Sequence, residues 1–258
     1  MSTPLAFRVA ESEARVYRRI WRGSVFTSFL TPVLYLVAMG VGLGTLIDAN
    51  TPDGVEGMSY LTFLAPGLLV ASAMQTGAGE GAWKVMAGFK WRKTYQATMA
   101  TPVSVRGLVL GLLLWAGVRI VMVSVAFAVV IALFRIVGPG PALLATIPGL
   151  LVGLATAAPV MAYTAALKKD QGLVTLFRFI IVPMFLFSGT FFPISQLPTW
   201  LQPVAFVTPL FHAVELARWL TLGIEPAVAP WISVGYLLVW FAAGTAAAIL
   251  MFTRKLRV

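Results

Sequence analysis

Long apolar runs, separated by short polar or basic segments, divide the chain from one end to the other. An α-helix needs about 20 mostly apolar residues to cross the hydrocarbon core of a bilayer. Runs of this length predict transmembrane helices over residues 24–47, 58–79, 107–134, 142–167, 172–192 and 230–252. The pattern therefore predicts an all-α polytopic membrane protein with six transmembrane helices in a single domain, 1–258.

The stretch between the fifth and sixth runs, residues 193–222, is apolar but contains Pro193, Pro198, Pro203 and Pro209. A proline inside a helix costs about 3 kcal/mol. We therefore expect short re-entrant or external helices over 193–222 and not a seventh membrane span.

Basic residues indicate on which side of the membrane each connection lies. With six spans, the connections on the side of the N-terminus hold Arg8, Arg15, Arg18, Arg19, Arg22, Lys84, Lys90, Arg92, Lys93, Arg106, Lys168, Lys169, Arg178, Arg254, Lys255 and Arg257. The opposite side holds Arg135 and Arg218, with the acidic residues Asp48, Asp53, Glu56, Glu215 and Glu225. Because basic connections stay in the cytoplasm, we predict that both termini are cytoplasmic, which requires an even number of spans.

The composition agrees with this topology. The chain is 59% hydrophobic and 11% charged, with a mean hydropathy of +0.90, whereas soluble domains are about 25% charged. The N-terminal segment lacks a short apolar core followed by a small-residue cleavage site, so we expect no secretory signal peptide. Topology and attraction to anionic lipid account for the formal net charge of +10, so nucleic acid is not an expected partner.

Glycine pairs four residues apart recur in the apolar runs, as at Gly40/Gly44 and Gly77/Gly81. Small residues at this spacing let two membrane helices approach closely. A chain with 23 glycines also contains some such pairs by chance, so each pair has two interpretations. Together the pairs favour a tightly packed helix bundle.

The sequence offers little chemistry of its own. No stretch matches the phosphate-binding pattern G-x-x-x-x-G-K-[ST], and the chain has no cysteine and one histidine, His212. Apart from Glu80, the spans contain no acidic residue, which argues against intramembrane proteolysis and against a proton-coupled carrier. We therefore expect no catalytic residue and no metal site, and an energy source supplied by a partner.

The segment 89–100 combines basic and aromatic side chains, with Lys90, Arg92 and Lys93 beside Trp91 and Tyr95. A short helix of this kind anchors to lipid or docks in the groove of a cytoplasmic protein. The residues alone leave both interpretations open.

Five stretches resemble one known family: "FLTPVLYLVAMGVGLG", "YLTFLAPGLLVASAM", "TYQATMATPVSVRGLVLG", "MFLFSGTFFPISQLP" and "PLFHAVELAR". They are similar, in the same order, to the permease subunits of ABC-2 exporters, and within these to the nodulation-type lipo-oligosaccharide exporters, with daunorubicin-resistance permeases nearby. Glu80 falls where this branch has an acidic residue. Pro66 departs from the pattern, which leaves the shape of the second span open.

The resemblance implies an amphipathic interfacial helix over 4–22 and a coupling helix over 89–100 that docks on an ATPase. The residues expected at that contact are Lys90, Trp91, Arg92, Lys93, Tyr95, Thr98 and Met99, with Glu80 as a coupling or gate residue. Two permeases, identical or related, would work with two nucleotide-binding subunits that bind ATP and magnesium. The complex would lie in a bacterial inner membrane and export an amphipathic lipid-linked saccharide, lipid or drug.

A dimer built on spans one, two and five would present Tyr35, Met39, Met74, Gln75, Phe187 and Ser188 to the substrate pathway. Ordinary helix packing is the alternative for each of them. Arg119, in the third span, must face the bundle interior or water, because an unpaired charge in lipid is costly. A proton-coupled secondary drug or metabolite carrier remains the alternative function.

Overall fold

The structure, a computed structural model, describes residues 5–51 and 54–256. Pro4, where the predicted interfacial helix begins, and Asp53 and Arg257, which enter the charge argument, lie outside the described residues. The first half of the chain forms α1 (Leu5–Tyr17), α2 (Trp21–Tyr35), η1 (Leu36–Leu43), α3 (Gly44–Asn50), α4 (Tyr60–Gly79), η2 (Glu80–Lys84), η3 (Ala87–Trp91), α5 (Thr94–Met99) and α6 (Val105–Leu133). The second half forms α7 (Pro139–Leu144), α8 (Thr146–Ala166), α9 (Gln171–Leu176), η4 (Phe177–Ile181), α10 (Val182–Phe187), η5 (Ile194–Gln196), α11 (Gln202–Val207), α12 (Pro209–Leu222) and α13 (Pro230–Leu256).

Within the described ranges, five helical stretches are long and apolar enough to cross a membrane. They are Trp21–Asn50, Tyr60–Trp91, Val105–Leu133, Pro139–Ala166 and Pro230–Leu256. The predicted all-helical class is confirmed. The fifth predicted span, 172–192, corresponds to a shorter apolar helix, Gln171–Phe187, which ends there because Gly189 has φ +81.

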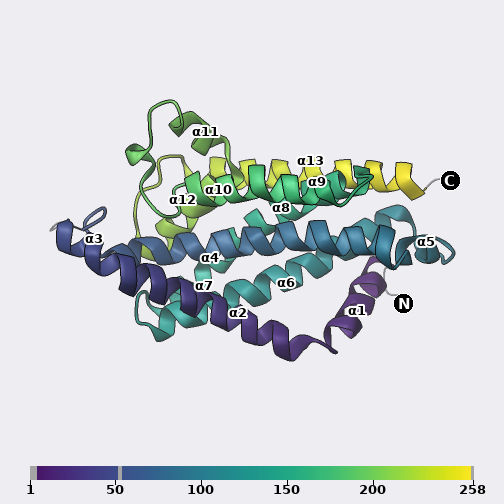
Figure 1. Ribbon diagram of the computed structural model, residues 1–258, viewed down its shortest axis with the longest axis horizontal. Helices are drawn as coiled ribbons and strands as arrows, with labels where there is room; N and C mark the ends of the chain where they lie inside the picture. Colours follow the sequence, from purple (N-terminus) through teal and green to yellow (C-terminus); the bar gives the residue numbers. More distant parts are fainter. Residues whose placement is uncertain (1–4, 52–53, 257–258) are drawn as a thin grey trace.

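The long helices lie roughly along one common direction, whereas the short helix α1 lies across it, as Figure 1 shows. Both described chain ends and α5 lie at one end of the bundle, which we call the basic end; it comprises α5, the loop 167–170 and the C-terminal turn of α13. The opposite end carries α3, α7, α11 and α12. The segment 193–222 thus forms short helices at the end opposite α5, and Pro203 and Pro209 stand in the first turns of α11 and α12, where a missing N–H costs nothing.

The helix α4 is the centre of the bundle. In its most apolar stretch 72% is buried, against 24% for the first long helix and 17% for α13. Its fully buried side chains include Phe63, Leu64, Leu68 and Met74. An element that packs against α4 therefore packs against the core of the bundle.

The N-terminal segment differs from the expectation. Helix α1 ends at Tyr17, and residues 18–20 form a tight turn before α2 begins at Trp21, so the prediction of one continuous helix over 4–22 is wrong. Helix α1 packs against α6, where a Cβ atom on Gly111 would stand 2.5 Å from the carbonyl oxygen of Ala6. This contact brings the apolar side of α1 onto protein, with Val9 buried.

The glycine pairs fall into two kinds. A Cβ atom on Gly77 of α4 would lie 2.0 Å from the carbonyl oxygen of Gly153, and one on Gly81 of η2 would lie 2.6 Å from that of Ala157. Both α4 and η2 therefore touch α8 backbone to backbone. A Cβ atom on Gly40 would meet only the flexible Leu61 side chain at 2.2 Å, and Gly44 has ordinary contact distances. The close approach expected from the spacing is thus present at Gly77 and Gly81.

The end opposite α5 is organised around Arg218 of α12, which is 4% exposed. Its guanidinium donates to the carbonyl oxygens of Gly189 (2.7 Å), Thr190 (3.3 Å) and Phe63 (3.3 Å). It also lies 3.6 Å from the centre of the Phe63 ring. One buried cation therefore ties α12 to the start of α4 and to the turn after α10.

We predict that Gly77→Ala destabilises the protein by about 1–3 kcal/mol, because the added methyl group meets backbone that cannot rotate away. Gly79→Ala is the matched control, since a Cβ atom at Gly79 has no neighbour within 4 Å. Thermal unfolding of the two purified variants in the same detergent measures the difference. Equal melting temperatures would contradict the backbone contact.

Candidate functional site

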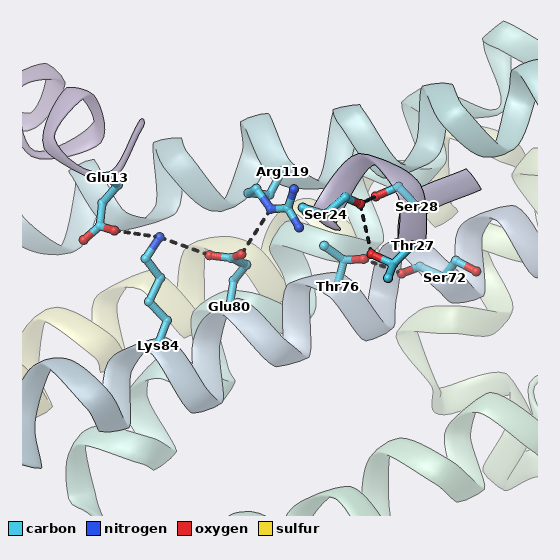
Figure 2. A network of polar contacts seen from close by, with 9 residues as sticks. All are labelled: Glu13, Ser24, Thr27, Ser28, Ser72, Thr76, Glu80, Lys84 and Arg119. Atoms are coloured by element: carbon cyan, nitrogen blue, oxygen red, sulfur yellow. Dashed lines mark hydrogen bonds and ion pairs between the residues drawn. The ribbon is translucent and has the colours of Figure 1, made fainter. Parts of the chain in front are cut away.

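A chain of alternating charges joins three helices near the basic end, as Figure 2 shows. Arg119 Nε of α6 lies 3.5 Å from Glu80 Oε1, and Lys84 Nζ lies 3.3 Å from Glu80 Oε2 and 2.9 Å from Glu13 Oε2 of α1. These four side chains are between 16% and 24% exposed. Ion pairs at this level of burial are screened by solvent far less than surface pairs.

Aromatic rings cover the two cations of this network. The Arg119 guanidinium lies 4.6 Å from the centre of the Tyr17 ring, and Lys84 Nζ lies 5.0 Å from that of Trp115. The Tyr17 and Trp115 rings pack edge to face at 5.5 Å. Arg119 therefore lies between helices, paired with Glu80, and does not project into lipid.

The predicted coupling helix over 89–100 is interrupted. The long helix that begins with α4 ends at Trp91, Lys93 has φ +52, and a new helix, α5, covers only Thr94–Met99. A positive φ at a residue with a Cβ atom breaks helical hydrogen bonding, so the prediction of one helix over 89–100 is wrong. Residues 92–93 form a corner that turns α5 away from α4.

Tyr95 does not project from this segment. It is 4% exposed, and its ring packs 5.0 Å from Phe89 and 5.8 Å from Phe252 of α13. A Cβ atom on Gly88 would overlap the same ring. The Tyr95 ring therefore attaches α5 to α13 and does not lie on the exposed face where a partner was expected to contact it.

The other predicted docking residues have different surroundings. Arg92 and Lys93 are exposed, as are the neighbours Thr94, Gln96 and Ala97, whereas Thr98 and Met99 are half-buried. Arg92, Lys93, Thr94 and Gln96 thus present a basic and polar surface at the corner and on the outer face of α5.

Lys90 and Trp91 both bind Asp170, in the loop that follows α8. Lys90 Nζ lies 3.0 Å from Asp170 Oδ1, and Trp91 Nε1 donates to Asp170 Oδ2 at 3.3 Å. The hydrogen bond from Lys90, with a smaller contribution from Trp91, holds the pKa of the Asp170 carboxyl below its usual range. A carboxyl whose pKa is lowered on folding stabilises the fold above its unfolded pKa, so this contact is present at neutral pH and is lost as the pH falls through the folded pKa.

The six residues predicted for the substrate pathway are not brought together in one chain. Met74 and Ser188 are fully buried, and the Ser188 hydroxyl is hydrogen-bonded to the Met184 carbonyl (2.6 Å) and the Thr208 hydroxyl (2.7 Å). Tyr35 packs on Phe185, with ring centres 6.3 Å apart. Met39 and Gln75 are half-buried.

Phe187 lines a long apolar groove that the other five do not line. The groove has a volume of about 1040 Å³. It runs between α8, the helix formed by α9, η4 and α10 (the α9–α10 helix), α11 and Trp240 of α13. Thr156 is also among its lining residues, and its buried hydroxyl has no hydrogen-bond partner within the described chain. An apolar cleft of this size is typical of a binding site for an apolar group.

His212 and Glu215 do not pair with each other. His212 Nδ1 lies 3.0 Å from the Ser233 hydroxyl, and Glu215 Oε2 accepts a hydrogen bond from the Ala227 N–H at 2.7 Å. Both side chains therefore hold the α12–α13 connection in place.

Sequence reasoning missed the partners of the site. Glu13 and Lys84 complete the charge network, and Asp170 binds Lys90 and Trp91. One signal was available: Glu80 and Lys84 are four residues apart, a spacing that places opposite charges together on a helix. Nothing in the sequence indicated that Arg119 or Asp170 lies beside the helix that continues α4.

Comparison with known proteins gives a consistent result. A family model described as "ABC-2 type transporter" matches residues 8–222. Nodulation protein J of Rhizobium meliloti (strain 1021) is 30% identical over 208 residues, covering 80% of this chain and 77% of that protein. Nodulation protein J of Rhizobium leguminosarum bv. viciae is 28% identical over 93% of both chains. The inner membrane transport permease YadH of Escherichia coli (strain K12) is 25% identical, covering 83% of this chain and 81% of that protein.

We predict that Arg119→Met destabilises the protein by about 2 kcal/mol, because it leaves the partly buried Glu80 with Lys84 alone. Arg15→Met is the control: its pair with Glu11 is exposed, and such pairs contribute little. Chemical or thermal unfolding in detergent compares the two. An Arg119→Met variant as stable as Arg15→Met would show that the network does not hold α1, α4 and α6 together.

Proposed function

Because the chain belongs to the ABC-2 type transporter family, we propose that it is the permease subunit of an exporter that moves an amphipathic substrate out of the cytoplasm or the inner leaflet. The observation that carries the proposal is the family match over residues 8–222, together with the exposed corner Arg92–Lys93 at the end of the central helix. A separate ATP-binding subunit supplies the energy, and ATP and magnesium bind to that subunit.

The proposed topology has six spans, with Gln171–Phe187 as the fifth. Its length lies at the lower limit of about 17 residues for a spanning helix, and its apolar exposed side chains support a membrane location. The distribution of Lys and Arg supports cytoplasmic termini in a bacterial inner membrane. Some of the short helices at the end opposite α5 would then be re-entrant.

The working unit would contain two permeases, identical or related, and two ATP-binding subunits. Large exposed apolar side chains on the first long helix, such as Phe26, Leu34 and Leu46, support contact with lipid or with a second permease. When ATP binding closes the ATPase pair, α5 would move and open the pathway outward, and hydrolysis would reset it.

A lipid-linked saccharide is the substrate class that we favour. The sequence resembles nodulation-type lipo-oligosaccharide exporters, and both rhizobial relatives described above carry the name Nodulation protein J. The apolar groove beside Phe187 suits an acyl chain, which would be held there by van der Waals packing. A lipid or an apolar drug would fit the same lining.

We predict that an ATP-binding protein copurifies with the wild-type chain from native membranes in mild detergent, and that Arg92→Glu/Lys93→Glu abolishes its recovery. The exchange reverses two charges on the exposed corner without entering the core. Arg18→Glu/Arg19→Glu, an equal charge change on the exposed turn after α1, is the control and should keep the partner. Mass spectrometry and an ATPase assay of the eluate give the readout.

Recovery of no ATP-binding protein with any form would contradict the exporter proposal. Transport that survives ATP depletion but stops when the proton gradient collapses would favour the proton-coupled carrier in its place.

A further inference from the structure

The helix formed by α9, η4 and α10 is attached to the core along one face, through the buried side chains of Leu173, Leu176, Ile181 and Phe185. Val174, Phe179 and Ile180 are 57%, 69% and 56% exposed, and the apolar groove separates part of its length from α8 and α11. It contains a π-helical segment, Phe177–Ile181, a feature that marks local irregularity and is frequent at functional sites.

Asp170 stands immediately before this helix, at its N-cap position, yet makes no capping hydrogen bond with its side chain. An aspartate here ordinarily accepts from a backbone N–H of the first turn. Its two carboxylate oxygens instead accept from Lys90 and Trp91. The local capping hydrogen bond is therefore replaced by a contact between residues 80 positions apart in the sequence.

The same loop is held from a second side by the C-terminal turn of α13. Lys255 Nζ donates to the carbonyl oxygens of Ala165 (2.6 Å) and Leu167 (3.0 Å), which fixes the end of α8. Lys90 Nζ also donates to the Lys168 carbonyl oxygen at 2.5 Å. The end of α8 is thus fixed at Leu167, and Asp170 begins the next helix three residues later.

A further contact links the same two elements about two helical turns before Lys90. Trp83 of η2 stacks on Phe177 of η4, with ring centres 5.9 Å apart and an angle of 26° between the planes. The extension of α4 that ends at the Arg92–Lys93 corner therefore touches the α9–α10 helix at both Trp83 and the Lys90–Trp91 pair.

We propose that Asp170 is a positioning residue that passes movement of the Arg92–Lys93 corner to the α9–α10 helix, so that this helix shifts when the partner ATPase binds nucleotide. The inference rests on the proposed function. Movement at the corner has a covalent route to α4 and α6. Its polar and aromatic contacts with the α9–α10 helix and the loop before it are those of Asp170, the Lys90–Lys168 hydrogen bond and the Trp83–Phe177 stack.

The contact is too exposed to matter much for stability: the Lys90 side chain is 30% exposed and that of Asp170 48%, and exposed pairs contribute little to folding. A test must therefore report coupling and not stability. The chain contains no cysteine, so one introduced cysteine labels a single position without background.

The experiment places bimane, a fluorophore sensitive to its surroundings and to nearby tryptophan, on Val174→Cys in the permease purified with its ATPase in lipid nanodiscs. ATP with vanadate traps the nucleotide-bound state. We expect a change in bimane emission in the otherwise wild-type chain, and a change about fivefold smaller in Asp170→Ala, with ATPase recovery and melting temperature unchanged.

Two matched variants complete the design. Lys169→Ala alters the neighbouring exposed side chain, which makes no polar contact in the part of the chain that the structure describes, and should respond as the wild type does. The conservative exchange Asp170→Glu keeps both carboxylate oxygens as acceptors for Lys90 and Trp91 and should retain the response. A fully retained response in Asp170→Ala, or no response in the wild-type background although the ATPase is bound, would overturn the inference.

Failure of the proposed function is distinguishable from failure of the inference. If no ATPase accompanies the Val174→Cys protein, both are overturned, and the purification shows this before any fluorescence is measured. If the ATPase is present, the fluorescence result decides on Asp170 alone.

Discussion

The other arrangements depend on one constraint, the direct backbone contact of α8 with α4 and its continuation η2. This contact is possible because Gly77 and Gly81 have no side chain. It places α4 at the centre of the bundle, where hydrogen-bonded backbone and small residues allow the densest packing. The same helix continues through Glu80 and Lys84 to Lys90 and Trp91. One central helix therefore contributes residues to both the charge network and the contact with Asp170, and a displacement of its end would move both.

The charge network links this helix to α1 and α6. Two carboxylates and two cations alternate along it, so the group is neutral as a whole, and each charge is stabilised by a neighbour of opposite sign. Charges placed singly at this depth would cost several kcal/mol each. Helix α1 is consequently held on one side by apolar contact with α6 and on the other by Glu13, which makes it part of the bundle as well as an amphipathic surface helix.

The long apolar helices could be predicted because a run of about 20 apolar residues has few other uses, and the family could be recognised from five ordered stretches. The interruption of the helix at Lys93 could not be predicted, because a positive φ at a lysine has no signature in the sequence. The burial of Tyr95 depends on Phe252, more than 150 residues away, and the partner of Lys90 depends on how α4 and α8 are aligned. The fifth span was predicted to end at residue 192, whereas the helix ends at Phe187. That end depends on the turn whose carbonyl oxygens bind Arg218.

The central claim is that an ATP-binding protein docks on the surface formed by α5 and the Arg92–Lys93 corner. Its most direct test is photo-crosslinking in intact cells with p-benzoylphenylalanine at Gln96, exposed on α5, and at Trp200, which is 72% exposed at the opposite end. The account predicts that Gln96 yields an adduct with an ATP-binding subunit and that Trp200 does not. Adducts of an ATP-binding subunit at Trp200, or of lipid alone at Gln96, would contradict it.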